Sequence, residues 1–246
     1  MSKEHLYIVS GASRGMGRAI ALQLVRVGHV VLGLSRQVPA APAGLEQWPC
    51  DLADPLPVAA RLEAWLSSLD GTRFASASLI NNAAWVPTPG PIQTAEASAL
   101  SASLRVGLEA PLLLSAAFLH ATRDWTAKRR VLHISSGLGR RAIAGTAPYC
   151  AVKAGLDHLA RAMALDEAQQ GSKGAKVVSL APGVIDTDMQ VQLRGADPSR
   201  FPDHALFVQM QREGRLDSPD AAATKVIAYL HRADFGQQPV ADVREA

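Results

Sequence analysis

HLYIVSGASRGMG, residues 5–17, is the stretch of sequence that decides the fold. Its first six residues form a short apolar run with β-branched side chains, which predicts a buried strand. A helical pattern, RAIALQLVRVG, follows and ends at Gly28. A strand, a glycine-rich turn and a helix in this order are typical of a dinucleotide site, because glycines let the backbone approach a pyrophosphate and the helix N-terminus offers free N–H groups. A tight turn that binds no ligand is the alternative for this motif taken alone.

Strand and helix patterns alternate along the rest of the chain. We expect further strands at 29–35, in a short run ending near Cys50, and at 76–83, 130–135, 175–181 and 239–243. We expect helices at about 16–28, 55–70, 95–122, 146–170 and 218–231, the third interrupted by Pro111. Repeated β–α units predict a mostly parallel seven-stranded sheet with helices on both faces. Residues 1–246 are therefore expected to form a single doubly wound α/β domain of the Rossmann type, with ligands at the carboxyl ends of the strands.

Tyr149 and Lys153 are four residues apart on the expected helix 146–170, so they share one face of it. An ammonium beside a phenol favours the phenolate, and we therefore expect Lys153 to lower the pKa of Tyr149 from its usual value of about 10. Ser136, at the end of the preceding expected strand, can bring a hydroxyl to the same point. Such a set can hand a proton to a carbonyl oxygen. A helix-surface contact without a chemical role is the alternative.

These motifs together resemble the short-chain dehydrogenase/reductase family, over nearly the whole chain. The turn GASRGMG matches the family's GxxxGxG pattern, and Asn81-Asn82-Ala83-Ala84 resembles its NNAG segment. Ser136, Tyr149 and Lys153 fall at its catalytic spacing, and PGVIDT, residues 182–187, resembles its PG motif.

The resemblance implies a nicotinamide cofactor that carries a hydride, and a carbonyl or alcohol substrate. Tyr149 would be the general acid in reduction and the general base in oxidation. Lys153 would also bind the nicotinamide ribose, and Ser136 would hold and polarise the carbonyl. Ser135 is the weaker candidate, because its side chain should point the other way along a strand. Asn81 is expected on the cofactor side of the site.

The end of the expected second strand favours NADP(H) as the cofactor. An NAD site usually places a carboxylate there, whereas this chain has Ser35 and Arg36. Arg36 can pair with a 2′-phosphate, and Arg14 could reach the same phosphate from the glycine turn; two surface arginines are the alternative. Asp51 resembles the family's adenine-binding position, although it or Asp54 could instead cap a helix. The expected cofactor contacts are Gly11, Ser13, Arg14, Gly15, Met16, Gly17, Ser35, Arg36, Asp51, Leu52, Asn82, Ala83, Tyr149, Lys153, Pro182, Gly183, Ile185 and Thr187.

Two positions depart from the family pattern. Gly107 stands where many members carry an asparagine that holds a proton-relaying water behind the lysine. Gly107 cannot bond through a side chain, so another residue, a water-filled gap or a slower relay must serve. Ala84 replaces the usual glycine of NNAG, which we expect to be a local packing change.

The segment 188–217 is expected to be a lid over the substrate. Its apolar residues indicate an apolar ligand, unless they only pack the lid onto the body: Met189, Leu193, Phe201, Leu206, Phe207 and Met210. The C-terminal half resembles the sepiapterin reductase and benzil reductase branch of the family, which implies reduction of ketones and vicinal diketones with NADPH. A 3-oxoacyl-carrier-protein reductase and a non-catalytic NADP-binding regulator are the alternatives. The first would need a basic docking patch, and Gly107 is the only feature that favours the second.

Bulk properties exclude several other classes. The chain has 246 residues, a net charge of +3 and 48% hydrophobic residues, as expected for a soluble globular protein. Its basic residues are scattered, which argues against a nucleic-acid partner. We expect no metal, no signal peptide and no membrane-spanning helix. Two cysteines indicate a reducing cytoplasm without a disulfide framework. The family resemblance implies a homodimer or homotetramer formed through helices 95–122 and 146–170.

Overall fold

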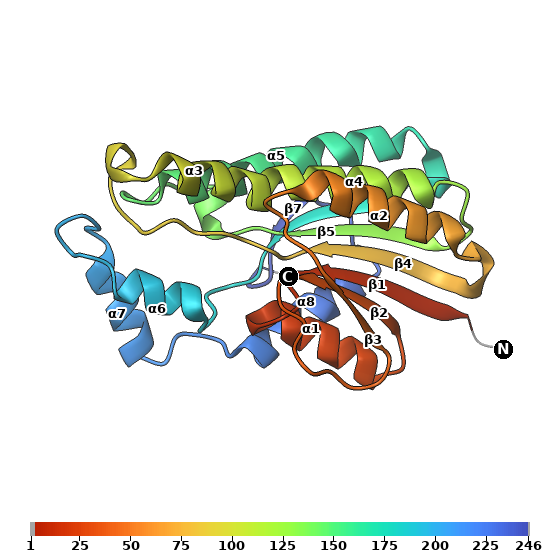
Figure 1. The fold of residues 1–246 in the computed structure, drawn as a ribbon, viewed down its shortest axis with the longest axis horizontal. Helices are drawn as coiled ribbons and strands as arrows, with labels where there is room; N and C mark the ends of the chain where they lie inside the picture. Colours follow the sequence, from red (N-terminus) through yellow and green to blue (C-terminus); the bar gives the residue numbers. More distant parts are fainter. Residues whose placement is uncertain (1–2, 246) are drawn as a thin grey trace.

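A seven-stranded, wholly parallel sheet forms the centre of the protein, described here from a computed structural model that covers residues 3–245 (Figure 1). The strands lie in the order β3-β2-β1-β4-β5-β6-β7. They are β1 (Glu4–Ser10), β2 (Val30–Ser35), β3 (Leu45–Pro49), β4 (Phe74–Asn81), β5 (Lys128–Ile134), β6 (Lys176–Ala181) and β7 (Val240–Asp242). The strand order reverses between β1 and β4, and a sheet of this kind opens a crevice for ligands at that point.

Helices cover both faces of the sheet, which confirms the doubly wound α/β fold (Figure 1). One face carries α2 (Pro55–Ser68), α3 (Ala97–Leu104), α4 (Ala110–Ala121) and α5 (Ala147–Ala168). The other face carries α1 (Gly15–Arg26) and α8 (Pro219–Leu230). The expected elements all occur, with ends that differ by a few residues.

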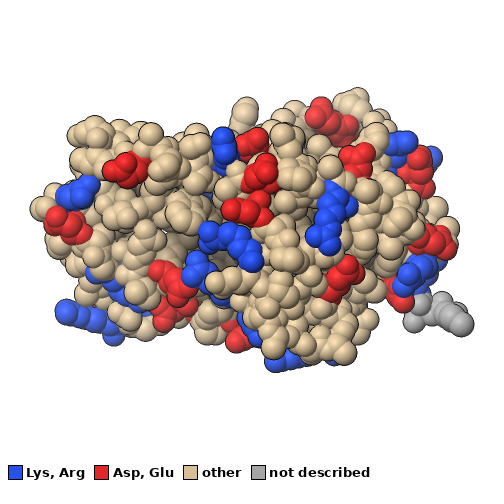
Figure 2. Space-filling model, viewed as in Figure 1, with Lys and Arg blue, Asp and Glu red and all other residues tan. Residues whose placement is uncertain are grey.

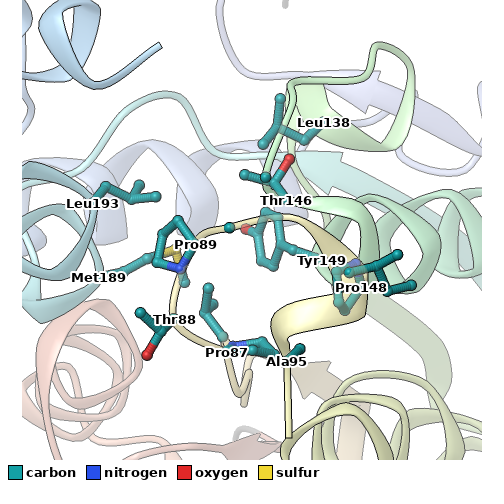
Figure 3. A pocket seen from close by; sticks show the side chains of 14 residues that line it. Pro87, Thr88, Pro89, Ala95, Leu138, Thr146, Pro148, Tyr149, Met189 and Leu193 are labelled. Carbon is teal, nitrogen blue, oxygen red and sulfur yellow. The ribbon is translucent and has the colours of Figure 1, made fainter. Parts of the chain in front are cut away.

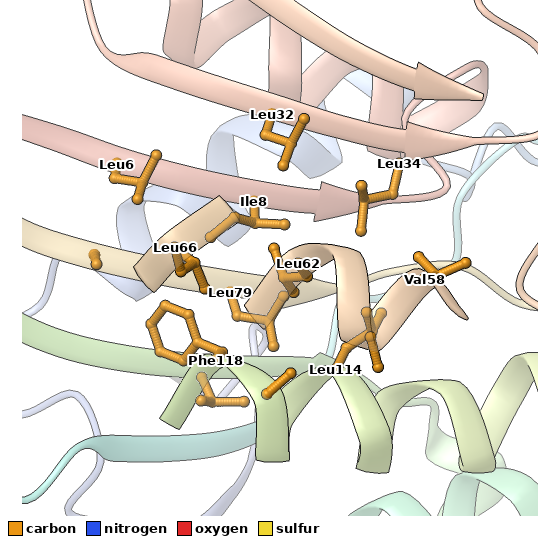
Figure 4. Packing of buried hydrophobic residues seen from close by; sticks show 14 of the residues in the cluster. Leu6, Ile8, Leu32, Leu34, Val58, Leu62, Leu66, Leu79, Leu114 and Phe118 are labelled. Atoms are coloured by element: carbon orange, nitrogen blue, oxygen red, sulfur yellow. The ribbon is translucent and has the colours of Figure 1, made fainter. Parts of the chain in front are cut away.

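Each face of the sheet has its own hydrophobic core. Side chains of alternating orientation along each strand divide between the two cores, as the two-residue period of a strand requires. On the α2, α4 and α5 side, Leu6, Leu79 and Phe118 are fully buried (Figure 4). On the α1 and α8 side, Val9 and Ile80 are fully buried. Because the central strands are covered on both faces, the sheet gives the loops at its carboxyl edge a firm base.

The segment 97–121 is one continuous helix. The sequence had led us to expect an interruption at Pro111. A π-helical turn, Arg105–Glu109, joins α3 to α4, and the Ala110 N–H donates to the Arg105 carbonyl. Pro111 has no N–H to offer to the Gly107 carbonyl, and the wider turn accommodates this without a break. By length and composition this helix could also cross a membrane, as core helices often can. Its residues Leu114 and Phe118 pack in the core between α2 and the sheet, which accounts for its apolar composition.

The segment between β6 and α8 projects beyond the layered body and contains α6 (Asp188–Arg194) and α7 (His204–Arg212) (Figure 1). Ile185 and Asp217 form a parallel bridge at its base, so the segment leaves and rejoins the body at one point. Phe201 and Phe207 pack against each other inside it, with ring centres 5.4 Å apart.

Charged residues of both signs are interspersed over the face seen in Figure 2.

Candidate active site

With the exception of Asn81, the residues expected to act in catalysis or cofactor binding line one cleft at the carboxyl edge of the sheet. The turn after β1, the loop after β2, the loop after β4, the start of α5 and the loop after β6 all open into it. Sequence motifs that lie far apart in the chain therefore meet where the strand order reverses. The cleft is further lined by side chains that sequence reasoning missed, among them Trp85 and Arg244.

The glycine turn is held open by its backbone conformation. Gly11 and Gly15 have φ values of 70° and 54°, which side-chain-bearing residues rarely adopt. A Cβ on Gly17 would lie 2.3 Å from both the Gly11 carbonyl oxygen and the Asn82 amide nitrogen. Asn82 donates from that amide to the Ser10 carbonyl, at 3.0 Å. Asn82 thus ties the end of β4 to the turn and fixes the shape of the floor of the cleft.

The N-terminus of α1 has the features of an anion site. Arg14 is its capping residue, and among the described residues its side chain makes no capping hydrogen bond, which leaves the N–H groups of the first turn available to a ligand. A Cβ on Gly15 would lie 3.6 Å from the Thr187 methyl group on the opposite wall. A narrow passage lined by N–H groups and the positive end of a helix dipole fits a pyrophosphate.

The two arginines expected to select NADP(H) lie in different settings. Arg14 forms an ion pair with Asp188 at the start of α6, with 2.5 Å between the nearest nitrogen and oxygen. Arg36, beyond the end of β2, is exposed and its guanidinium lies over the Trp85 ring. Asp51 accepts a hydrogen bond from the Ala53 N–H, and Asp54 is the residue that precedes α2, without a side-chain capping bond.

Ser136, Tyr149 and Lys153 come together at the deep end of the cleft. Ser136 follows β5 and its hydroxyl accepts a hydrogen bond from the Leu138 N–H. Lys153 is almost fully buried, and its ammonium donates to the Ile134 carbonyl at 2.7 Å. The ammonium lies 5.4 Å from the centre of the Tyr149 ring. The shared helix face predicted from the four-residue spacing is therefore present.

The expected lowering of the Tyr149 pKa is not seen. Burial raises the pKa of the Tyr149 phenol to about 12, and the neighbouring Ser136 hydroxyl only partly opposes this rise. Burial also lowers the pKa of Lys153 to about 8, with Asp157 acting in the opposite direction. Desolvation is the largest cause of both pKa shifts, and the lysine ammonium donates to the Ile134 carbonyl.

A buried carboxylate, Asp157, fixes the strand ends behind the catalytic set. It accepts hydrogen bonds from the hydroxyls of Ser135 and Ser179, at 2.6 and 2.7 Å. Arg140 lies 3.3 Å from its other oxygen and also donates to the Ala241 carbonyl. The Ser135 hydroxyl is therefore bound by Asp157, although Ser135 also lines the cleft, and Arg140 is bound to the body of the protein.

Asn81 does not face the cofactor side of the site, contrary to our expectation. It is buried under α4, where its amide nitrogen lies 3.2 Å from both the Ser115 hydroxyl and the His133 Nδ1. Asn82, one residue further on, lines the cleft instead. The alternation of side chains along β4 explains the difference, because neighbours point to opposite faces.

Gly107 is buried in the π-helical turn and packs directly against α5. A Cβ at this position would lie 2.5 Å from a methyl group of Val152, the neighbour of Lys153. An asparagine therefore cannot be accommodated here unless the Val152 side chain moves. The Val152 side chain fills the space that a side chain at position 107 would need, so the packing of α5 requires the glycine that departs from the family pattern.

A second, apolar pocket adjoins Tyr149 (Figure 3). Its walls come from the loop after β4, from the start of α5 and from α6. Among the residues that the structure describes, no charged side chain lines this pocket. The lining residues are Val86, Pro87, Thr88, Pro89, Gly90, Ile92, Ala95, Leu138, Gly145, Thr146, Pro148, Tyr149, Met189 and Leu193.

Some of the apolar lid residues line the pocket, as expected for ligand contact, and others only pack within the fold. Met189 and Leu193 face this pocket, whereas Phe201 is fully buried within the lid. The loop that supplies Val86 to Ala95 was not recognised, because it lacks regular periodicity. Its three prolines, Pro87, Pro89 and Pro91, were the feature of the sequence that could have indicated a rigid loop.

Comparison with known proteins identifies the family. Residues 5–197 match the family model of the short chain dehydrogenases. A benzil reductase ((S)-benzoin forming) of Bacillus cereus is 32% identical over 246 residues, covering 97% of this chain and 98% of that protein. The enzyme of the same name from Bacillus subtilis (strain 168) is 33% identical over 228 residues, covering 92% and 93%.

A solved structure from Beutenbergia cavernae, with NADP bound at low occupancy, superposes with a TM-score of 0.80. It is 26% identical, and the match covers 98% of this chain and 95% of that one. This chain belongs to the short-chain dehydrogenase/reductase family. It is an oxidoreductase that uses a nicotinamide cofactor and acts on carbonyl or alcohol groups.

Proposed function

We propose that this protein is an NADP(H)-dependent carbonyl reductase that acts on ketones and vicinal diketones with apolar, aromatic-sized substituents. One observation carries the proposal: Tyr149 lines both the nucleotide-sized cleft and the adjoining apolar pocket. A carbonyl held in that pocket would have its oxygen beside a phenol and its carbon facing the cleft. The benzil reductases among its relatives support the aromatic diketone as the type of substrate.

The chain's own residues fit a dinucleotide cofactor. The unpaired N–H groups of α1 and the glycine turn would hold the pyrophosphate, and Lys153 would bind the nicotinamide ribose. Ile185 and Thr187 would contact the nicotinamide side, while Asp51 and Ala83 would line the adenine end. The nicotinamide, when bound, supplies the hydride. The exposed guanidinium of Arg36 and the lack of a carboxylate directly after β2 in the sequence favour NADP(H) over NAD.

In the proposed reduction, three side chains handle the substrate oxygen. Ser136 donates a hydrogen bond that holds the carbonyl in line and stabilises the charge that develops on its oxygen. Tyr149 delivers its proton to that oxygen as the carbon becomes tetrahedral, and takes it back in the oxidation. The buried Lys153 ammonium stabilises the phenolate that remains after the transfer.

The shape of the apolar pocket supports an uncharged, flat substituent. Pro87, Pro89 and Pro148 form walls with little freedom to rearrange, and Leu138 and Leu193 close the sides (Figure 3). A carboxylate or phosphate placed there would lose its hydration without a compensating partner. We therefore expect discrimination against substrates that are charged next to the reacting carbonyl.

The test is the loss of NADPH absorbance with benzil as the substrate. The purified protein should oxidise NADPH with benzil, and Tyr149→Phe should reduce kcat by at least about a hundredfold, because the phenol is the proposed proton donor. Ser135→Ala, one residue from the proposed Ser136 but with its hydroxyl bound to Asp157, is the matched control and should retain far more activity than Ser136→Ala. Full turnover in Tyr149→Phe would overturn the mechanism. An acetoacetyl thioester reduced much faster than benzil would overturn the substrate class.

We further propose a homo-oligomer, a dimer or a tetramer, and a cytoplasmic location. Leu104, Leu112 and Leu165 are large exposed apolar residues on the helices expected to form the interface, which supports the first proposal. The two free cysteines support the second. Light scattering on the purified protein measures the oligomeric state.

A further inference from the structure

Arg36 and Trp85 face each other on the rim of the cleft. Arg36 directly follows β2, and Trp85 lies in the loop after β4. The guanidinium carbon of Arg36 lies 5.5 Å from the centre of the Trp85 ring, within the range of a cation–π contact. Both residues line the cleft that holds the glycine turn and Asp51. The contact is therefore placed where the adenosine end of a dinucleotide would lie.

Arg36 keeps its hydrogen-bonding groups free in this arrangement. Within residues 3–245, the Arg36 guanidinium has no carboxylate or carbonyl partner, whereas Arg14 is paired with Asp188. Stacking uses the flat face of a guanidinium and leaves the N–H groups at its edge available. Those donors match a phosphate, which accepts two parallel hydrogen bonds from an arginine.

The backbone of Trp85 is anchored by a hydrogen bond, and its indole ring is not part of the hydrophobic core. Its carbonyl oxygen accepts a hydrogen bond from the hydroxyl of Ser103, which is completely buried in α3. The side chain remains 38% exposed and belongs to none of the hydrophobic clusters of the described residues. A large aromatic side chain in this position is therefore free to act on its neighbour Arg36 and on a ligand.

We infer that Trp85 is a specificity-determining residue, which holds the Arg36 guanidinium in place to receive the 2′-phosphate of the cofactor. This inference rests on the proposed preference for NADP(H). An unrestrained arginine would lose more side-chain freedom when it binds the phosphate, so the stacked indole lowers the entropic cost of binding. Trp85 would favour the phosphorylated nucleotide without touching the phosphate itself.

The test compares two nucleotides that differ in one phosphate. Adenosine 2′,5′-bisphosphate and 5′-AMP are titrated into the full-length protein by calorimetry, which needs no turnover. Trp85→Leu should weaken binding of the bisphosphate by about three- to tenfold, the range expected for a partly exposed cation–π contact, and change 5′-AMP binding by less than about twofold. Trp85→Phe keeps an aromatic face and should retain most of the preference.

A double-mutant cycle identifies Arg36 as the intermediary. Arg36→Gln should weaken bisphosphate binding on its own, and adding Trp85→Leu should then have little further effect. Arg26→Gln, an exposed arginine in the last turn of α1, is the matched control for loss of a positive charge and should leave both affinities unchanged. Circular dichroism of each variant establishes that it is folded.

The possible outcomes separate this inference from the proposed function. Equal weakening of both nucleotides by Trp85→Leu would show that the indole acts on adenosine itself, and would overturn the inference. A normal bisphosphate affinity in Trp85→Leu alongside a weakened one in Arg36→Gln would also overturn it, while leaving the NADP(H) preference intact. If Arg36→Gln has no effect, both the cofactor preference and this inference fail. A failure to reduce benzil would affect the substrate alone.

Discussion

Lys153 holds its proton in an almost fully buried position, and this governs how the site depends on pH. Burial lowers the pKa of Lys153 to about 8, so the ammonium begins to lose its proton just above neutrality. Burial has the opposite effect on the phenol, because it disfavours the phenolate, and the pKa of Tyr149 rises to about 12. The proton donor is therefore intact throughout the neutral range, while its cationic neighbour is not.

Carbonyl reduction should slow above about pH 8, where Lys153 becomes neutral and can no longer stabilise the phenolate left by proton transfer. The measurement is kcat for benzil reduction with saturating NADPH from pH 6 to pH 10. Lys153→Arg keeps a positive charge at every pH in this range and should move the decline to higher pH, at a lower overall rate. A rate that stays constant up to pH 10 in the unaltered protein would contradict this role of Lys153.

The identity of the reacting residues could be predicted from the sequence, but their electrostatics could not. The spacing of Tyr149 and Lys153 is enough to place them on one helix face. Whether the lysine lowers the pKa of the tyrosine depends on how much water each group loses and on where the ammonium points, here the Ile134 carbonyl. Asn81 and Asn82 show the same limit, because their order in the strand does not reveal which one faces the cleft.

The π-helical turn between α3 and α4 shows how one element adapts to two constraints at once. Pro111 removes a hydrogen-bond donor, and the close approach of α5 leaves no room for a side chain at Gly107. The sequence indicated a helix with a weak point at Pro111. It could not reveal the wider turn, because the fit against Val152 is a contact between residues distant in the chain.

Gly107→Ala should destabilise the protein, although alanine is the better helix former. Overpacking against Val152 costs about 1–3 kcal/mol, whereas the gain in helix propensity is about 1 kcal/mol. The free energy of unfolding in urea measures the difference. Val152→Ala should relieve the clash, so the two changes together should cost less than the sum of the separate changes. Additive losses would show that residues 107 and 152 do not press on each other.

The stability of the whole molecule depends on pH, and the buried His133 side chain contributes to this dependence. His133 is completely buried between the sheet and α4, and burial, with a smaller effect of Lys153, lowers its pKa to about 3 from 6.5. Between about pH 6.5 and pH 3, His133 is therefore protonated in the unfolded chain and neutral in the folded chain. The resulting stability is fully present above pH 6.5 and is lost as the pH falls from there towards 3.

The free energy of unfolding should decrease by about 1.4 kcal/mol per pH unit on account of His133 alone between about pH 6 and pH 4. Urea unfolding at a series of pH values measures this slope. His133→Asn should flatten it by about that amount, even though the loss of packing lowers stability at pH 7. His158→Asn, on the exposed face of α5, is the matched control. An unchanged slope in His133→Asn would show that other groups cause the acid sensitivity.

The sheet and its covering helices were predictable because their signals are local and repeated: apolar strands, glycine turns and amphipathic helices. The loop Val86 to Ala95 and the packing inside the lid were not, since each takes its shape from contacts with the rest of the fold. The residues that would recognise a substrate are therefore the least visible in the sequence, and those that would hold a cofactor the most visible.

The lid leaves the body at Ile185 and returns at Asp217, where the two residues bridge. A segment anchored in this way can be lengthened, shortened or exchanged without altering the path of any strand. Selection can thus act on the lid side chains that line the apolar pocket, Met189 and Leu193, while Thr187 and Asp188, which lie beside the glycine turn, are kept. In such an architecture, the choice of substrate can change over evolutionary time while the nucleotide site is inherited intact.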